Sequence, residues 1–136
     1  MAMNIIAEVA ATSAAASFNE EKHYYPIAFD NDGETFTIVN NGTAPAPCCI
    51  TIIPKNDIML LEIEGLAKDT ISMSRIKADQ VLIIDNINKK VTIDDVDAFE
   101  FFEGWELPYL NPGSNTIKIT NGAQLSLSIE YQPAYI

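Results

Sequence analysis

Residues 99–131 read FEFFEGWELPYLNPGSNTIKITNGAQLSLSIEY, and they hold the chain's only Trp, two turns that contain Pro and two alternating runs. Apolar and polar residues alternate over residues 116–120 and again over residues 125–131, so each run has one apolar face and one polar face. This pattern is typical of strands that are buried on one side only. The stretch therefore predicts two half-buried strands near the end of the chain.

The connection between these two runs predicts how they would pair. A two-residue turn at Asn121-Gly122 would place apolar side chains opposite polar ones. A three-residue loop over residues 120–122, with Gly122 in the left-handed conformation, would instead pair Ile119 with Ala123 and Ile117 with Leu125. We therefore expect a bulged hairpin.

The chain upstream is a succession of short strand-like runs separated by Gly, Pro, Asn and Asp. The runs are residues 34–39, 48–53, 58–64, 70–74, 80–85, 90–94 and 99–102. The polar residues 86–89 predict a second hairpin between residues 82–84 and 91–93. Strand signals about every ten residues, without a helical period, predict an all-β fold, an antiparallel β-sandwich or jelly roll.

The first part of the chain differs in composition from the rest. Residues 4–17 are rich in Ala but have neither a strong helix cap nor a sustained amphipathic stripe, so a helix and a tail are both open. Strand formers and turn residues begin at Tyr24. We place an N-terminal extension or linker at residues 1–22 and one β-sandwich domain at residues 23–136.

Charge and hydrophobicity exclude two classes of partner. The 136 residues contain 8 Lys and Arg against 19 Asp and Glu, a formal net charge of -11, which repels phosphate backbones. The longest aliphatic run, Ile58-Met59-Leu60-Leu61, is far shorter than the ~20 residues that cross a bilayer. We therefore expect no nucleic-acid partner and no membrane insertion.

The two cysteines are neighbours in the sequence. Adjacent residues of a strand point to opposite faces, so a disulfide between Cys48 and Cys49 would be strained. We expect reduced, partly buried thiols, consistent with synthesis in a reducing cytoplasm.

The sequence offers little for catalysis. Nucleophilic catalysis needs a base, usually His, and the single His, His23, is expected near the flexible start and outside the sheet. Glycosidases need two carboxylates at a set separation, and acidic residues are too plentiful here for any pair to stand out. We therefore predict a protein that is not an enzyme, with no catalytic residues and no cofactor.

Acidic turns raise the question of a metal. Residues 30–34 (DNDGE) resemble the start of a calcium loop but lack the spaced bidentate Glu of an EF-hand. A denser cluster contains Asp94, Asp95, Asp97, Glu100 and Glu103. Solvated turns explain both stretches better, so no metal site is predicted, and a rise in the unfolding temperature with added calcium would reverse that view.

Aromatic residues are the candidate contacts for a sugar or a protein partner, because their rings combine an apolar face with a polar rim. The candidates are Trp105, Tyr109, Tyr24, Tyr25 and Tyr135. Packing in the core and loops is their commoner role. If the alternation of a strand over residues 99–102 continued through Gly104, Trp105 would be buried, and Trp105→Ala would cost about 3–5 kcal/mol.

Several motifs resemble the C-terminal domain of siphophage distal tail proteins, in the right order and over roughly residues 36–133. The motifs are residues 41–47 (NGTAPAP) with the apolar run 48–53, residues 103–108 (EGWELP), residues 110–117 (LNPGSNTI) and residues 129–133 (IEYQP). The resemblance implies a galectin-like jelly roll. This resemblance in fold does not imply lectin activity, because the galectins' sugar signature of His, Asn and Arg is missing and Arg75 is the sole Arg.

The resemblance also implies a function. The chain would be a structural virion protein of a phage or prophage tail tip or baseplate, made in the host cytoplasm and acting through protein–protein contacts. The family's N-terminal domain forms a ring, and without such a domain we expect a monomer or weak dimer. The alternative is a carbohydrate-binding module for adsorption to the host cell wall, and a third reading is a bacterial surface protein that uses the same sandwich for adhesion.

Overall fold

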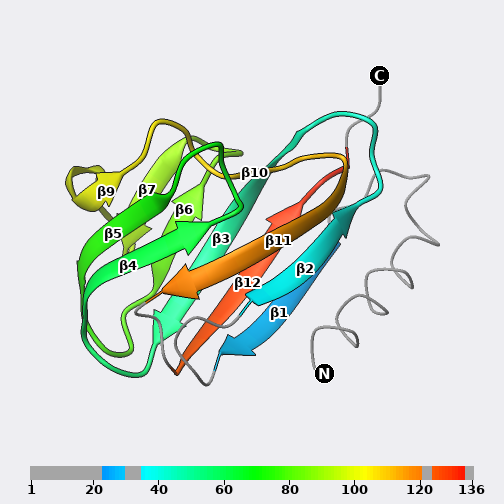
Figure 1. Cartoon of the computed structure of the whole chain (residues 1–136). Helices are drawn as coiled ribbons and strands as arrows, with labels where there is room; N and C mark the ends of the chain where they lie inside the picture. The colour runs from blue at the N-terminus through cyan, green and yellow to red at the C-terminus, as the bar shows by residue number, and fades with distance from the viewer. Residues whose placement is uncertain (1–22, 30–34, 121–123, 134–136) are drawn as a thin grey trace.

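The computed structural model describes residues 23–29, 35–120 and 124–133, and within them two antiparallel sheets stack as the layers of a β-sandwich (Figure 1). The seven-stranded sheet has the order β1 (His23–Phe29), β12 (Leu125–Tyr131), β3 (Ala46–Pro54), β6 (Leu82–Asp85), β7 (Lys90–Ile93) and β8 (Val96–Asp97), and β10 (Tyr109–Leu110) also pairs with β3. The five-stranded sheet has the order β2 (Thr35–Asn40), β11 (Gly113–Thr120), β4 (Ile58–Glu64), β5 (Ile71–Ile76) and β9 (Phe102–Glu103). The all-β sandwich predicted from the sequence is confirmed.

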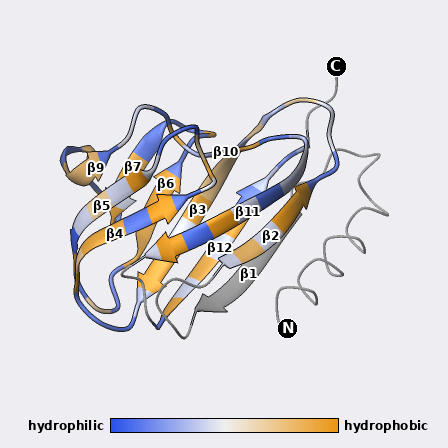
Figure 2. Ribbon diagram, viewed as in Figure 1, coloured by the Kyte–Doolittle hydropathy of each residue, from blue (hydrophilic) through white to orange (hydrophobic). Residues whose placement is uncertain are grey.

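Alternating side chains form the core between the two sheets. Ile50 and Ile52 of β3 and Ile117 and Ile119 of β11 are all buried, while their sequence neighbours on the same strands are more exposed. The ribbon coloured by hydropathy shows this alternation clearly along β11 (Figure 2). Apolar burial of this kind is the dominant favourable term in folding.

The predicted hairpin between the last two long strands is wrong. Strand β11 pairs with β2 and β4, whereas β12 pairs with β1 and β3, so the two strands lie in different sheets. Ile117 is paired with Phe36, and Leu125 with Pro54. Alternation predicts that a strand has one buried face, but it does not say whether the next strand lies beside it or across the core. The turn itself, residues 121–123, lies outside the described residues.

The predicted hairpin of β6 and β7 is confirmed, with Ile84 paired to Val91. Asp85 stabilises its turn, because its Oδ1 accepts hydrogen bonds from the backbone N–H groups of Ile87 (2.8 Å) and Asn88 (3.0 Å). Burial alone would raise the pKa of Asp85. Hydrogen bonds from the Asn88 backbone, the Asn88 side chain and the Ile87 backbone, together with the charge of Lys90, hold that pKa below its ordinary value.

Residues 99–102 do not form the predicted strand. Phe99–Phe101 is a short 3-10 helix, η2, and only Phe102–Glu103 continue as the two-residue strand β9. The helix begins after the buried Ala98 and connects β8 of one sheet to β9 of the other. The chain here crosses from sheet to sheet, so a strand periodicity does not apply.

Two further expectations concern single residues. His23 is the first residue of β1, paired with Tyr131, so the expectation that it lies outside the sheet is wrong. Cys48 and Cys49 form no disulfide, as predicted, and Cys48 is buried. Burial, with the charges of Cys49 and Asp85, raises the pKa of the Cys48 thiol, which is therefore protonated at neutral pH.

Candidate functional site

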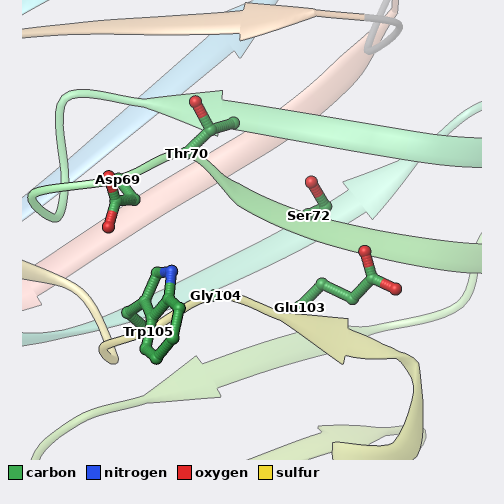
Figure 3. Close-up of a pocket in the computed structure, with 6 residues that line it drawn as sticks. All are labelled: Asp69, Thr70, Ser72, Glu103, Gly104 and Trp105. Atoms are coloured by element: carbon green, nitrogen blue, oxygen red, sulfur yellow. The ribbon is translucent and has the colours of Figure 1, made fainter.

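An open, shallow pocket lies at the edge of the five-stranded sheet where β5 pairs with β9 (Figure 3). Its lining residues come from the end of the β4–β5 loop, from β5 and from the segment that starts at β9: Asp69, Thr70, Ser72, Glu103, Gly104 and Trp105. Ser72 and Glu103 are a cross-strand pair, which fixes one wall of the pocket. Figure 3 shows Asp69 and Thr70 on one side of the indole and Ser72 beside Glu103 further along the strands.

Trp105 is not in the core. Its side chain is 88% exposed, so the expectation of a buried Trp is wrong, and the large stability loss expected on its removal loses its basis. The strand pairing ends at Glu103, and Gly104 and Trp105 follow in a bend outside any sheet. Without strand pairing there is no alternation to direct the indole inward.

The segment that carries Trp105 is nevertheless braced against the β4–β5 loop. The backbone N–H of Tyr109 donates to the carbonyl of Leu66 (2.7 Å), and Leu66 is itself fully buried. On the other side, Oε1 of Glu106 accepts hydrogen bonds from the backbone N–H of Lys68 (3.2 Å) and from the Tyr109 hydroxyl (3.4 Å). These bonds hold the two loops of the pocket in one arrangement.

A second set of contacts ties the segment to the seven-stranded sheet. The carbonyl of Pro108 accepts from the backbone N–H of Cys48 (3.2 Å) and from the side-chain amide of Asn86 (2.8 Å). Leu110 then pairs with Ala46 and is buried. An exposed Trp therefore lies on a fixed segment whose far end is part of the core.

Gly65 positions the opposite loop. Its φ of 98° is in the left-handed region, and an added Cβ would lie 2.0 Å from the backbone carbonyl oxygen of Thr116. Only Gly permits this approach of the β4–β5 loop to β11. Asp69 lies in the same loop, four residues later.

The pocket is acidic and lined by acceptors. Asp69 and Glu103 supply carboxylates, Thr70 and Ser72 supply hydroxyls, and none of the six lining residues is a cation. Burial, then the charge and hydrogen bond of Glu106, then the charge of Asp69 raise the pKa of the neighbouring Tyr109 hydroxyl above its ordinary value, so it stays protonated at neutral pH. The arrangement offers hydrogen bonds and an aromatic face to a ligand that is not an anion.

The other predicted aromatic contacts are not brought to this pocket. Tyr24 and Tyr25 lie in β1, paired with Glu130 and Ile129 in the other sheet, and Figure 1 shows β1 far from β9. Tyr109 adjoins the pocket through Glu106, while Tyr135 lies outside the described residues. The predicted platform of several aromatic residues is thus reduced to Trp105 and its neighbour Tyr109.

Two residues of the acidic cluster, Asp94 and Asp95, form the turn that follows β7. Asp94 and Asp95 both have positive φ and form the two-residue turn between Ile93 and Val96, and Oδ1 of Asp94 accepts from the backbone N–H of Val81 (2.8 Å). Across the part of the chain that the structure describes, no group of three or more His, Cys, Asp or Glu side chains is placed to hold a metal ion. The stretch 30–34 lies outside that part.

Sequence reasoning missed four of the pocket's residues, Asp69, Thr70, Ser72 and Glu103, as a group. Asp69 and Glu103 are 34 positions apart in the sequence, and only the pairing of β5 with β9 brings their surroundings together. The signal that was available is local. A Trp between Gly104 and Glu106, shortly before Pro108, has the flanks of an exposed turn more than those of a strand.

Comparison with known proteins gives one family. The model of the siphovirus-type tail component, C-terminal domain, matches residues 41–135. No curated protein matches the chain. A search for membrane-crossing helices among the described residues returns no candidate.

A solved structure agrees with that fold. The crystal structure of SPP1 Dit (gp 19.1), described as a paradigm of the hub adsorption apparatus in phages that infect Gram-positive bacteria, has a TM-score of 0.61 at 10% identity, covering 80% of this chain and 46% of that chain. The chain therefore spans less than half of SPP1 Dit. The phage P2 baseplate in its activated conformation with Ca (TM-score 0.48, 11% identity, 75% and 37% covered) and a ruminal GH26 endo-β-1,4-mannanase (0.41, 12%, 79% and 19%) are too dissimilar to support an argument.

Proposed function

Since the chain belongs to the siphovirus-type tail component family, as its C-terminal domain, and is a structural component of a phage tail, we propose that it acts at the distal tail or baseplate as a protein-interaction domain and not as an enzyme. The observation that carries this proposal is the family match over residues 41–135, which includes most of both sheets. Its partners are other tail or baseplate proteins. We place the assembled protein in the virion tail, after synthesis in the host cytoplasm.

A break in the strand pattern of β4 supplies a surface for such contacts. Met59 (80% exposed) and Leu60 are consecutive and both exposed, where regular alternation would expose one of them. On the neighbouring strand, Arg75 has a φ of 62°, so the irregularity involves both strands. Single exposed apolar residues are ordinary, but an adjacent pair that includes a flexible Met suits a protein contact.

Charge favours a basic partner. The net charge of -11 raises the rate of association with positively charged surfaces and weakens self-association of the isolated chain. We expect the isolated chain to be a monomer or weak dimer near neutral pH, with any ring dependent on a ring-forming domain. Association with a tail partner should weaken as salt is added.

Immunogold electron microscopy of intact virions tests the location. Antibodies against the chain should label the distal end of the tail, and labelling on the head alone, or on no virion, would contradict the proposal. Met59→Ser should lower the amount of the chain in purified tails. Val96→Ser is the matched control, because Val96 is also an exposed apolar residue (67%) but lies at the edge of the other sheet. Equal losses in the two variants would exclude the β4 surface.

A further inference from the structure

We propose that the pocket beside Trp105 is a carbohydrate site that binds a neutral sugar ring of a cell-surface polysaccharide. The site goes beyond the protein contacts proposed above and uses different residues of the five-stranded sheet. It consists of the exposed indole, two carboxylates and two hydroxyls that the pairing of β5 and β9 gathers around one pocket (Figure 3).

The indole of Trp105 provides the apolar part of the site. A pyranose ring has C–H groups on its faces and hydroxyls around its rim, so it can stack on an aromatic face while its rim stays hydrogen-bonded. Trp has the largest such face, and at 88% exposure almost all of it is available to a ligand. Trp105 is the most exposed large apolar residue in the described part of the chain, and it lies on a segment that hydrogen bonds hold in place.

The polar groups match the rim of a sugar. The carboxylates of Asp69 and Glu103 accept hydrogen bonds from sugar hydroxyls, and such charge-assisted bonds are about twice as strong as neutral ones. The hydroxyls of Thr70 and Ser72 both donate and accept, as the alternating groups of a polyol require. A lysine or arginine side chain is donor-only, so it would use these hydroxyls as acceptors alone, whereas a sugar uses them as donors and as acceptors.

Charge restricts the class of sugar. None of the lining residues is a cation, and the whole chain is strongly acidic, so phosphate-bearing or carboxylate-bearing saccharides are repelled. Neutral hexoses and N-acetylated hexosamines carry no such penalty. The proposal therefore commits to uncharged pyranosides.

The site is arranged before the ligand arrives. The bonds from Tyr109 to Leu66 and from Lys68 to Glu106 join the β4–β5 loop to the segment that carries Trp105, and Ser72 is paired with Glu103. Binding therefore does not have to order these loops, and less of the interaction free energy is lost to conformational entropy.

Because Trp105 is the only Trp, its fluorescence reports this one pocket in the full, unmodified chain. Titration with neutral oligosaccharides of glucose, galactose, mannose and N-acetylglucosamine should give a saturable change in emission with at least one of them. Asp69→Asn and Glu103→Gln should each weaken binding about tenfold or more, the loss expected for one charge-assisted hydrogen bond. Trp105→Ala should abolish binding in calorimetry.

The controls separate this site from the protein contacts. Met59→Ser should leave sugar binding unchanged, while Asp69→Asn should leave the chain's incorporation into tails unchanged, so either proposal can fail alone. Unfolding midpoints equal to that of the wild type show that the pocket variants are folded. A response to a phosphorylated oligosaccharide or a lysine-rich peptide but to no neutral sugar would overturn the inference, as would no saturable response to any of these probes.

Discussion

Two large aromatic residues near the end of the chain have opposite surroundings. Tyr131, at the end of β12, is 0% exposed, and its hydroxyl donates to the carbonyl of Val39 in the other sheet (3.0 Å). Trp105 is 88% exposed on the segment between β9 and β10. Both residues are bulky and amphipathic, so side-chain size does not explain the difference. Tyr131 lies in a strand that is paired on both sides, whereas Trp105 follows a strand that has just ended.

Backbone pairing, more than hydrophobicity, therefore determines which of the two aromatic side chains lies in the core. In β12 the ladders with β1 and β3 fix the direction of every side chain, and alternation sends Tyr131 inward. At Gly104 no ladder remains. The segment is fixed instead by single hydrogen bonds at Glu106 and Pro108, which hold its backbone but leave the indole outside.

The largest expected effect is at Tyr131. Tyr131→Ala should lower the free energy of unfolding by about 3–5 kcal/mol, because it leaves a cavity between the sheets. Urea denaturation measures this loss. Tyr131→Phe keeps the ring and removes only the hydroxyl, so it should cost about 1 kcal/mol. If Tyr131→Ala cost no more than Tyr131→Phe, the contrast between a core and a surface aromatic residue would fail.

A substitution at Gly65 tests how much the close approach of the β4–β5 loop to β11 contributes to stability. Gly65→Ala should destabilise the protein by about 3 kcal/mol, because the new Cβ would meet the backbone of Thr116 in a left-handed conformation. Gly113→Ala is the matched control, since Gly113 also has a positive φ (90°) but open space around its Cβ. Its cost should be near 1 kcal/mol. Thermal unfolding of the two variants gives the comparison, and equal costs would show that strain alone, without the close contact, explains Gly65.

The contribution of Asp85 to stability should depend on pH. Asp85→Ala should cost about 2 kcal/mol at neutral pH, because the turn after β6 loses its charged acceptor. The pKa of Asp85 is lowered in the folded state, so its contribution is full above the ordinary value of about 3.9 and is lost as the pH falls through the folded-state pKa. Urea midpoints at pH 7 and pH 3 should therefore show a smaller gap between wild type and variant in acid. A gap that widened in acid would contradict the direction of the shift.

The smallest expected effect is at Trp105. Trp105→Ala should change the free energy of unfolding by less than about 0.5 kcal/mol, as for other exposed residues. The same denaturation series as for Tyr131 measures it. A loss of several kcal/mol would mean that the indole is buried in solution, and the difference between the two aromatic residues would disappear.

The candidate contacts named from the sequence lie in different parts of the fold, and their role in binding stays a prediction. Trp105 and Tyr109 were singled out from the sequence and do lie at or beside the pocket, but Tyr24 and Tyr25 belong to a distant strand. The burial of Trp105 was predicted by extending an expected strand over residues 99–102. In the structure these residues form the helix η2 and the first residue of the two-residue strand β9. Short irregular elements that cross between sheets leave no periodic signal in a sequence.

By itself, the sequence determined the all-β class, most of the strands and which face of each is apolar, because these depend on local alternation and on turn residues. It also determined the hairpin of β6 and β7, whose strands are close along the chain. Only the tertiary structure decided that β11 and β12 lie in opposite sheets, and that Asp69 and Glu103 line the same pocket as Trp105. Those features depend on which strands pair over long separations, and a strand with one apolar face fits several partners equally well until the whole core is packed.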